Sequence, residues 1–83
     1  MIYIKYFAKY REWMQMPGEA LNAAPENIGE LKNLIRDKHA NALKMLDDPR
    51  CIVAINQQVM HGGDGALLKA GDEVAFYPPV TGG

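Results

Sequence analysis

Apolar and polar side chains alternate over the first part of the chain, residues 2–9. A two-residue period of this kind is typical of a strand that buries one face. We expect the face that carries Ile2 and Ile4 to meet the core, which leaves Phe7 on the opposite, exposed face. The predicted faces are Ile2, Ile4, Tyr6 and Ala8 on one side and Tyr3, Lys5, Phe7 and Lys9 on the other.

A short helical turn and a second strand are predicted next. Residues 11–15 suit a helical turn, and Pro17 and Gly18 are turn-forming residues that precede a strand predicted over 19–24. A strand in this position predicts a hairpin with the first strand.

Helical spacing replaces the alternation after residue 27. Asn27 followed by Glu30 has the spacing of a capping box. The apolar residues beyond it recur every three or four positions and predict a helix over 28–39. These apolar residues are Ile28, Leu31, Leu34 and Ile35. Ala42, Leu43 and Leu46 indicate a further helical piece, which ends before Pro49.

The second half of the chain predicts three more strands. Residues 51–55 form a continuous apolar run, which is typical of a central strand covered on both faces. A short segment at 59–60 follows, then a glycine-rich loop at 62–65 and a last strand at 73–77. Strands around one main helix predict a single α+β domain over residues 1–83, with the first and last strands side by side in the middle of the sheet.

The last strand runs into Pro78 and Pro79, which predicts an extended tail over 78–83. Each proline removes a backbone donor and fixes φ, so the chain leaves the sheet as an extended segment. Gly82 and Gly83 have no Cβ and therefore suit a narrow cleft in another protein. Six extended residues span roughly 20 Å.

Composition narrows the possible partners. The net charge of −1 disfavours a nucleic-acid partner, since phosphate contacts need a basic surface. The apolar runs are too short to span a membrane, and the first residues contain no signal-peptide pattern. Cys51 is the single cysteine and has no disulfide partner within the chain, so we expect a cytoplasmic protein.

Other chemistry finds little support in the sequence. His39 and His61 lack the spacing of metal ligands, so no metal site is expected. Cys51, which is followed by the apolar residues Ile52 and Val53, is interpreted as a packing residue rather than a sulfur carrier. Asp72 and Glu73 are interpreted as a turn that enters the last strand.

The sequence resembles the small subunits of molybdopterin synthase, which are ubiquitin-like sulfur carriers. The most specific similarity is the ending, residues 71–83, and it extends to Tyr6-Phe7-Ala8, Arg11-Glu12 and residues 53–57. Residues 13–17 and Cys51 depart from the family pattern. The resemblance implies a ubiquitin-like β-grasp fold, a mixed sheet with one main helix packed across it and a flexible Gly-Gly tail.

The resemblance also implies a function for the tail. Gly83 would be adenylated with ATP by a separate activating enzyme and then converted to a thiocarboxylate with sulfur from a donor protein. The tail would enter the large subunit of molybdopterin synthase, in a heterotetramer, and convert cyclic pyranopterin monophosphate into molybdopterin. The inserted residues would be Pro78, Pro79, Val80, Thr81, Gly82 and Gly83. This chain would bind no cofactor itself, and the large subunit would supply the catalytic groups.

Phe7, Val59 and Tyr77 are candidates for an exposed apolar patch. The resemblance implies that these positions dock on the partner proteins. Three alternatives stay open from the residues alone. They are a sulfur carrier for thiamine synthesis or tRNA thiolation, a ubiquitin-like modifier that joins Gly83 to a lysine, and an interaction module whose tail is inert.

Overall fold

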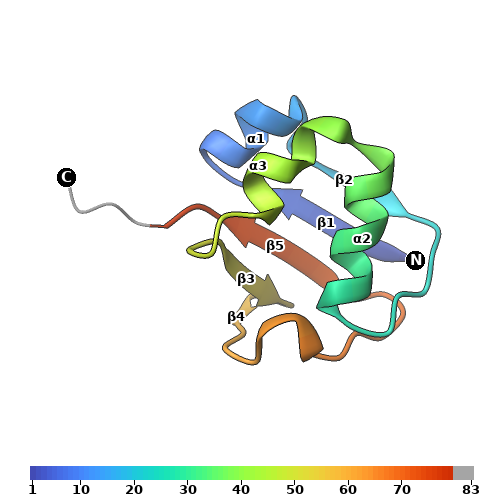
Figure 1. Ribbon diagram of the computed structural model, residues 1–83. Helices are drawn as coiled ribbons and strands as arrows, with labels where there is room; N and C mark the ends of the chain where they lie inside the picture. The colour runs from blue at the N-terminus through green and yellow to red at the C-terminus, as the bar shows by residue number, and fades with distance from the viewer. Residues whose placement is uncertain (80–83) are drawn as a thin grey trace.

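The computed structural model describes residues 1–79, and its helices and strands follow the order expected from the hydrophobic pattern (Figure 1). The predicted main helix and the predicted last strand are confirmed. The elements are β1 (Ile2–Tyr6), α1 (Lys9–Met14), β2 (Gly18–Leu21), α2 (Ile28–Lys38), the 3-10 turn η1 (Ala40–Ala42), α3 (Leu43–Leu46), β3 (Ile52–Ile55), β4 (Gln58–Val59), the 3-10 turn η2 (Gly63–Gly65) and β5 (Glu73–Tyr77).

The strands form one mixed sheet in the order β2-β1-β5-β3-β4. β1 is antiparallel to β2 and parallel to β5, and β3 is antiparallel to β5 and β4. The predicted pairing of the first and last strands in the middle of the sheet is confirmed, with Tyr6 opposite Phe76. Because β1 and β5 are parallel, both strands end at the same edge of the molecule.

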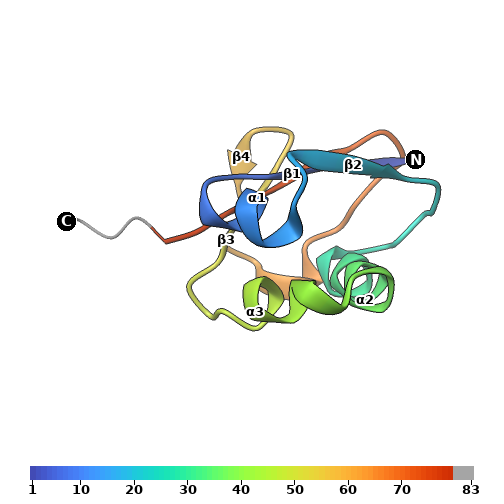
Figure 2. The same ribbon diagram turned by 90° about the horizontal axis from the view of Figure 1, so that it is seen from above.

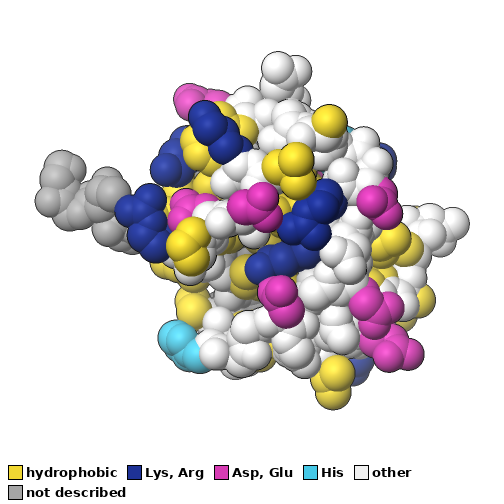
Figure 3. Space-filling model, viewed as in Figure 1, with side chains coloured by type: hydrophobic (Ala, Val, Ile, Leu, Met, Phe, Trp, Pro, Cys, Tyr) yellow, Lys and Arg dark blue, Asp and Glu magenta, His cyan; other side chains and the backbone are white. Residues whose placement is uncertain are grey.

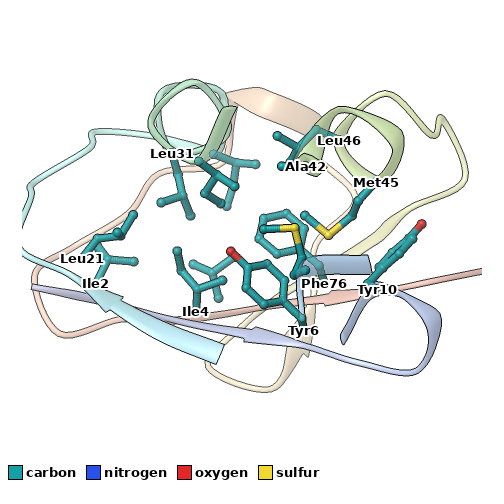
Figure 4. Packing of buried hydrophobic residues seen from close by; sticks show 14 of the residues in the cluster. Ile2, Ile4, Tyr6, Tyr10, Leu21, Leu31, Ala42, Met45, Leu46 and Phe76 are labelled. Atoms are coloured by element: carbon teal, nitrogen blue, oxygen red, sulfur yellow. The ribbon is translucent and has the colours of Figure 1, made fainter. Parts of the chain in front are cut away.

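The helices cover one face of this sheet. Figure 2 shows α2 and α3 together on one side of the strands. The Asn27 side chain caps α2 by accepting a hydrogen bond from the backbone N–H of Glu30 at 2.8 Å, which confirms the capping box. Figure 4 shows the buried side chains between sheet and helices, among them Ile2, Ile4, Tyr6, Leu31, Met45 and Phe76.

The first strand is shorter than predicted. β1 ends at Tyr6, and Ala8 adopts a positive φ of 53° that turns the chain into α1. The alternation predicted that Ala8 lies on the core face, and this prediction is wrong, because Ala8 is exposed. The second strand is also shorter, because β2 ends at Leu21.

The prediction of a fully covered central strand at 51–55 is wrong. β3 lies second from the edge, and β5 occupies the centre. Ile52 is only half-buried, because it lies on the face of the sheet that the helices leave open, and Val53, which packs against the core from the other face, is half-buried as well. Leu34, predicted on the buried side of α2, is 37% exposed.

A carboxylate with little exposure joins β2 to the end of α2. The Glu19 side chain is 10% exposed and accepts hydrogen bonds from the Tyr6 hydroxyl at 2.9 Å and from Nε2 of His39 at 2.7 Å. Nζ of Lys38 lies 2.8 Å from the other carboxylate oxygen. Burial opposes ionisation, but these hydrogen bonds outweigh it and hold the pKa of Glu19 below its ordinary value.

We expect Glu19→Gln to lower the free energy of unfolding at neutral pH by about 1–3 kcal/mol, because an amide cannot accept all three hydrogen bonds. The contribution of the Glu19 charge is complete above the ordinary pKa of 4.5 and is lost as the pH falls through the lower pKa of the folded state. Urea unfolding of both proteins between neutral pH and about pH 3 checks this. The difference between them should shrink below the ordinary pKa, and a difference that is constant with pH would contradict the assignment.

Candidate functional site

Two aromatic rings meet where β1 and β5 end. Tyr77 is the last residue of β5, and Phe7 follows the end of β1. The rings are stacked, with their centroids 4.4 Å apart and their planes 9° apart. The backbone N–H of Phe7 donates to the carbonyl oxygen of Phe76 at 3.2 Å, which extends the pairing of the two strands to this point. The parallel register therefore places an aromatic pair directly beside the start of the tail.

An apolar groove lies next to this pair, with a volume of about 670 Å³. Phe7, Val59 and Tyr77, the three predicted patch residues, all line it, and Val59 is 51% exposed. Lys9 is the charged residue among those that line the groove. The remaining lining residues are Ala8, Ile52, Ala54, Gln57, Pro78 and Pro79. The structure thus brings together the residues that follow β1, the first residue of α1 and side chains of β3, β4 and β5 around the base of the tail.

Ile52 and Ala54 were missed as groove residues in the sequence. Both lie on β3, two positions apart, and therefore on the same face. Their two-residue spacing was a signal, but the continuous apolar run suggested burial on both faces. Ile52 lies opposite Tyr77 in the sheet, which carries the groove from β5 onto β3.

The turn between β3 and β4 holds Val59 against the groove. Asn56 and Gln57 have positive φ angles of 49° and 70°, as a tight hairpin turn requires. The Asn56 side chain accepts from the backbone N–H of Glu73 at 3.0 Å and donates to Asp72 at 3.0 Å. The hydrogen bond from Asn56, with another from the Lys69 backbone, holds the pKa of Asp72 below its ordinary value. The backbone N–H of Asp72 donates to the carbonyl oxygen of Lys69 at 3.1 Å, which confirms the predicted turn before β5, and the Asp72 residue in this turn is only 6% exposed.

We expect Asn56→Ala to lower the free energy of unfolding by about 1–3 kcal/mol, because alanine loses both hydrogen bonds and disfavours a left-handed backbone. Asn56→Gly is the matched variant, since it removes the same hydrogen bonds but tolerates the positive φ. Urea unfolding should give a smaller loss for glycine than for alanine. Equal stability of both variants and the wild type would show that this turn does not depend on Asn56.

The predicted tail is described only at its base. Pro78 and Pro79 follow β5 and line the groove. The predictions for Val80, Thr81, Gly82 and Gly83 lie outside the described residues.

The titratable groups nearby favour structural roles. Burial raises the pKa of the half-buried Cys51 thiol, which keeps it protonated and agrees with packing. His39 is hydrogen-bonded to Glu19 and forms the C-terminal cap of α2. Within residues 1–79, no three His, Cys, Asp or Glu side chains are grouped to hold a metal ion. Over the same residues, no helix has the length and apolar character needed to cross a membrane.

Comparison of the sequence with known proteins identifies its family. The model of the ThiS family matches residues 4–83. The molybdopterin synthase sulfur carrier subunit of Haemophilus influenzae is 37% identical over 86 residues, and the match covers both chains completely. The same subunit of Escherichia coli is 31% identical over 83 residues, again with complete coverage of both chains.

Solved structures share the fold over almost the whole chain. Small archaeal modifier protein 1 of Haloferax volcanii superposes with a TM-score of 0.82 at 22% identity, covering 99% of this chain and 98% of that one. Its counterpart from Methanosarcina acetivorans has a TM-score of 0.78 at 28% identity, covering 99% and 95%. A complex of subunits 1 and 2 of the molybdopterin-converting factor of Helicobacter pylori contains a chain with a TM-score of 0.72 at 21% identity, covering 99% and 97%.

These similarities agree with the architecture of the described residues. The mixed sheet with α2 packed across it confirms the predicted α+β, ubiquitin-like β-grasp fold. The full-length matches confirm the resemblance that the ending of the sequence had suggested. The chain belongs to the ThiS family, and the relatives that it matches over its whole length are molybdopterin synthase sulfur carrier subunits.

Proposed function

We propose that this chain is the sulfur-carrying small subunit of molybdopterin synthase and that it carries sulfur as a thiocarboxylate on Gly83. One observation carries the proposal. The apolar groove lined by Phe7, Val59 and Tyr77 lies at the point where the chain leaves the sheet through Pro78 and Pro79. A partner seated on this groove receives the residues that follow the prolines. The full-length similarity to sulfur carrier subunits supports the same role.

Loading of sulfur requires activation, because a carboxylate is a poor electrophile. An activating enzyme joins the Gly83 carboxylate to AMP and releases pyrophosphate from ATP. A persulfide of a donor protein then displaces AMP and forms an acyl disulfide. A thiol cleaves the sulfur–sulfur bond, which leaves the thiocarboxylate on Gly83 and a disulfide on the donor side. None of these three steps needs a catalytic side chain from this chain.

Delivery takes place in the large subunit, to which the tail brings the sulfur. The thiocarboxylate sulfur bonds to a carbon of cyclic pyranopterin monophosphate and displaces an oxygen substituent, whose carbon–oxygen bond breaks. Water then cleaves the acyl–sulfur bond, which leaves the sulfur on the pterin and restores the carboxylate of Gly83. Two deliveries supply the two sulfurs of molybdopterin. The Helicobacter pylori complex joins subunits 1 and 2 of a molybdopterin-converting factor, which supports a partner of this type.

A reconstituted reaction tests the proposal. The chain, an activating enzyme, ATP and a sulfur donor are combined with the large subunit and the pterin precursor. We expect molybdopterin to form in proportion to the amount of thiocarboxylated chain, at two chains per product. No product from a chain that is fully thiocarboxylated would contradict the molybdopterin role and favour a carrier for thiamine synthesis or tRNA thiolation.

A protein modifier is the second candidate function, because small archaeal modifier protein 1 shares the fold at 28% identity. In that role, a lysine amine attacks the activated Gly83 and forms an isopeptide bond. Mass spectrometry of tryptic peptides distinguishes the two functions, because a modified lysine would carry residues 70–83 of this chain, which follow its last basic residue, Lys69. The sulfur-carrier proposal predicts no such conjugates in cells that supply the sulfur donor.

A further inference from the structure

A second surface lies beside the groove, around Trp13 of α1. Nζ of Lys9 lies 5.2 Å from the centroid of the indole, and Nζ of Lys44 lies 5.0 Å from it. Lys9 and Trp13 come from α1, whereas Lys44 comes from α3. In Figure 3, which has the same view as Figure 1, Lys and Arg side chains lie beside hydrophobic side chains in the region of α1. We call Lys9, Trp13 and Lys44 the lysine–tryptophan surface.

The lysine–tryptophan surface is held in place by its surroundings. Nδ2 of Asn41 donates to the carbonyl oxygen of Trp13 at 2.6 Å, which ties α1 to η1. The indole also packs against the buried ring of Tyr10, at a centroid distance of 5.6 Å. A surface that is ordered before binding loses less conformational entropy when a partner docks.

The two lysines have no carboxylate within ion-pair distance among residues 1–79. Asp47 and Asp48 line a hollow together with Lys9, Trp13 and Lys44, but each aspartate already forms an ion pair with an arginine. Arg36 lies 3.3 Å from Asp47, and Arg50 lies 3.4 Å from Asp48. The positive charge beside Trp13 is therefore left for a partner.

Lys9 connects this surface to the groove, because it lines both hollows. We infer that the lysine–tryptophan surface is a second docking site, which binds an acidic segment of the protein that receives the tail. This inference rests on the proposed function, since it requires such a partner. Because Lys9 joins the two sites, a partner that covers Phe7 and Tyr77 reaches Trp13 over a continuous surface.

An acidic protein segment fits this surface better than a nucleic acid does. Among residues 1–79, two lysines without an ion-pair partner flank the indole, which is fewer than the several phosphate contacts that a nucleic acid makes. The net charge of the chain is −1, which disfavours a long polyanion. A short segment with one or two carboxylates and an apolar side chain matches two ammonium groups and one indole face.

The test compares two charge reversals that change the net charge equally. Lys44→Glu alters the lysine–tryptophan surface without touching the groove, whereas Lys69→Glu alters an exposed lysine away from both. Association of each thiocarboxylated chain with the large subunit is followed by stopped flow from low salt to about 0.3 M salt. We expect Lys44→Glu to slow association at low salt about tenfold and to flatten its salt dependence. Lys69→Glu should stay within about threefold of the wild type.

A second variant tests the aromatic part of the surface. Trp13→Phe keeps an aromatic ring on α1 but removes most of the face that the lysines flank, so we expect the complex to dissociate several-fold faster. Circular dichroism of each variant verifies that the fold is intact.

Equal slowing by Lys44→Glu and Lys69→Glu would overturn the inference, because net charge alone would then explain the effect. Binding of an oligonucleotide that only Lys44→Glu abolishes, with normal association with the large subunit, would also overturn it. Failure of the wild-type chain to bind the large subunit would instead contradict the proposed function itself.

Discussion

Removal of Gly83 is expected to abolish sulfur transfer while the fold stays intact. The shortened chain ends at Gly82, so any carboxylate that is activated lies one residue, about 3.3–3.6 Å, short of its place in the partner's active site. Because a misplacement of about 1 Å lowers rates by about 10²-fold, we expect a loss of at least that size in molybdopterin formation. Single-turnover assays with the large subunit measure it.

A matched variant separates the length of the tail from its width. Gly83→Ala keeps the length and the carboxylate but adds a Cβ at the reacting residue, and we expect it to lose activity as well, because a narrow cleft excludes the methyl group. Both variants should unfold within about 0.5 kcal/mol of the wild type, since the core of the protein lies within the described residues. Unfolding of the shortened chain under native conditions would contradict the account, and full activity of both variants would show that the tail is inert.

Replacement of Phe7 by alanine is expected to weaken binding of the large subunit by about 30-fold or more, the equivalent of about 2 kcal/mol. The Phe7 ring stacks on Tyr77 at 4.4 Å and lines the groove at the base of the tail. Alanine removes this ring from the centre of the proposed interface and leaves Tyr77 without its stacking partner. Isothermal titration calorimetry of the two proteins measures the change.

Tyr3 provides the control for this substitution. It is an aromatic residue of β1, 47% exposed, and does not line the groove. We expect Tyr3→Ala to change the affinity by less than about threefold, because isolated exposed residues contribute little to binding. Equal losses for Tyr3→Ala and Phe7→Ala would indicate that the partner covers the open sheet broadly rather than this groove.

The local signals in the sequence predicted the elements that frame the site. The capping box at Asn27 and the helical spacing after it gave the bounds of α2 to within one residue. The two prolines after Tyr77 marked the end of β5 where the structure places it. Phe7 and Tyr77 were predicted to be exposed because alternation along a strand indicates which side chains share a face, whereas the family resemblance supported grouping them with Val59, and all three line the groove.

Features that depend on tertiary contacts were not predictable from local pattern. The apolar run at β3 suggested burial on both faces, yet the helices cover one face and Ile52 lines the groove on the other. The alternation in the sequence continues to Lys9, but β1 ends at Tyr6, and two residues later the positive φ of Ala8 turns the chain into α1. The two lysines that flank Trp13 come from helices about thirty residues apart, so only the packing of α1 and α3 shows that they meet.

The most direct test is intact-mass spectrometry of the chain isolated from its native cells. Replacement of one carboxylate oxygen by sulfur adds roughly 16 Da, which equals the mass added by oxidation of any of the five methionines, so fragmentation must locate the change. The proposed function predicts that the added mass lies on Gly83 and disappears after incubation with the large subunit and the pterin precursor. A Gly83 that stays unmodified in those cells, and also after ATP, an activating enzyme and a sulfur donor are supplied, would contradict the claim that this chain carries sulfur.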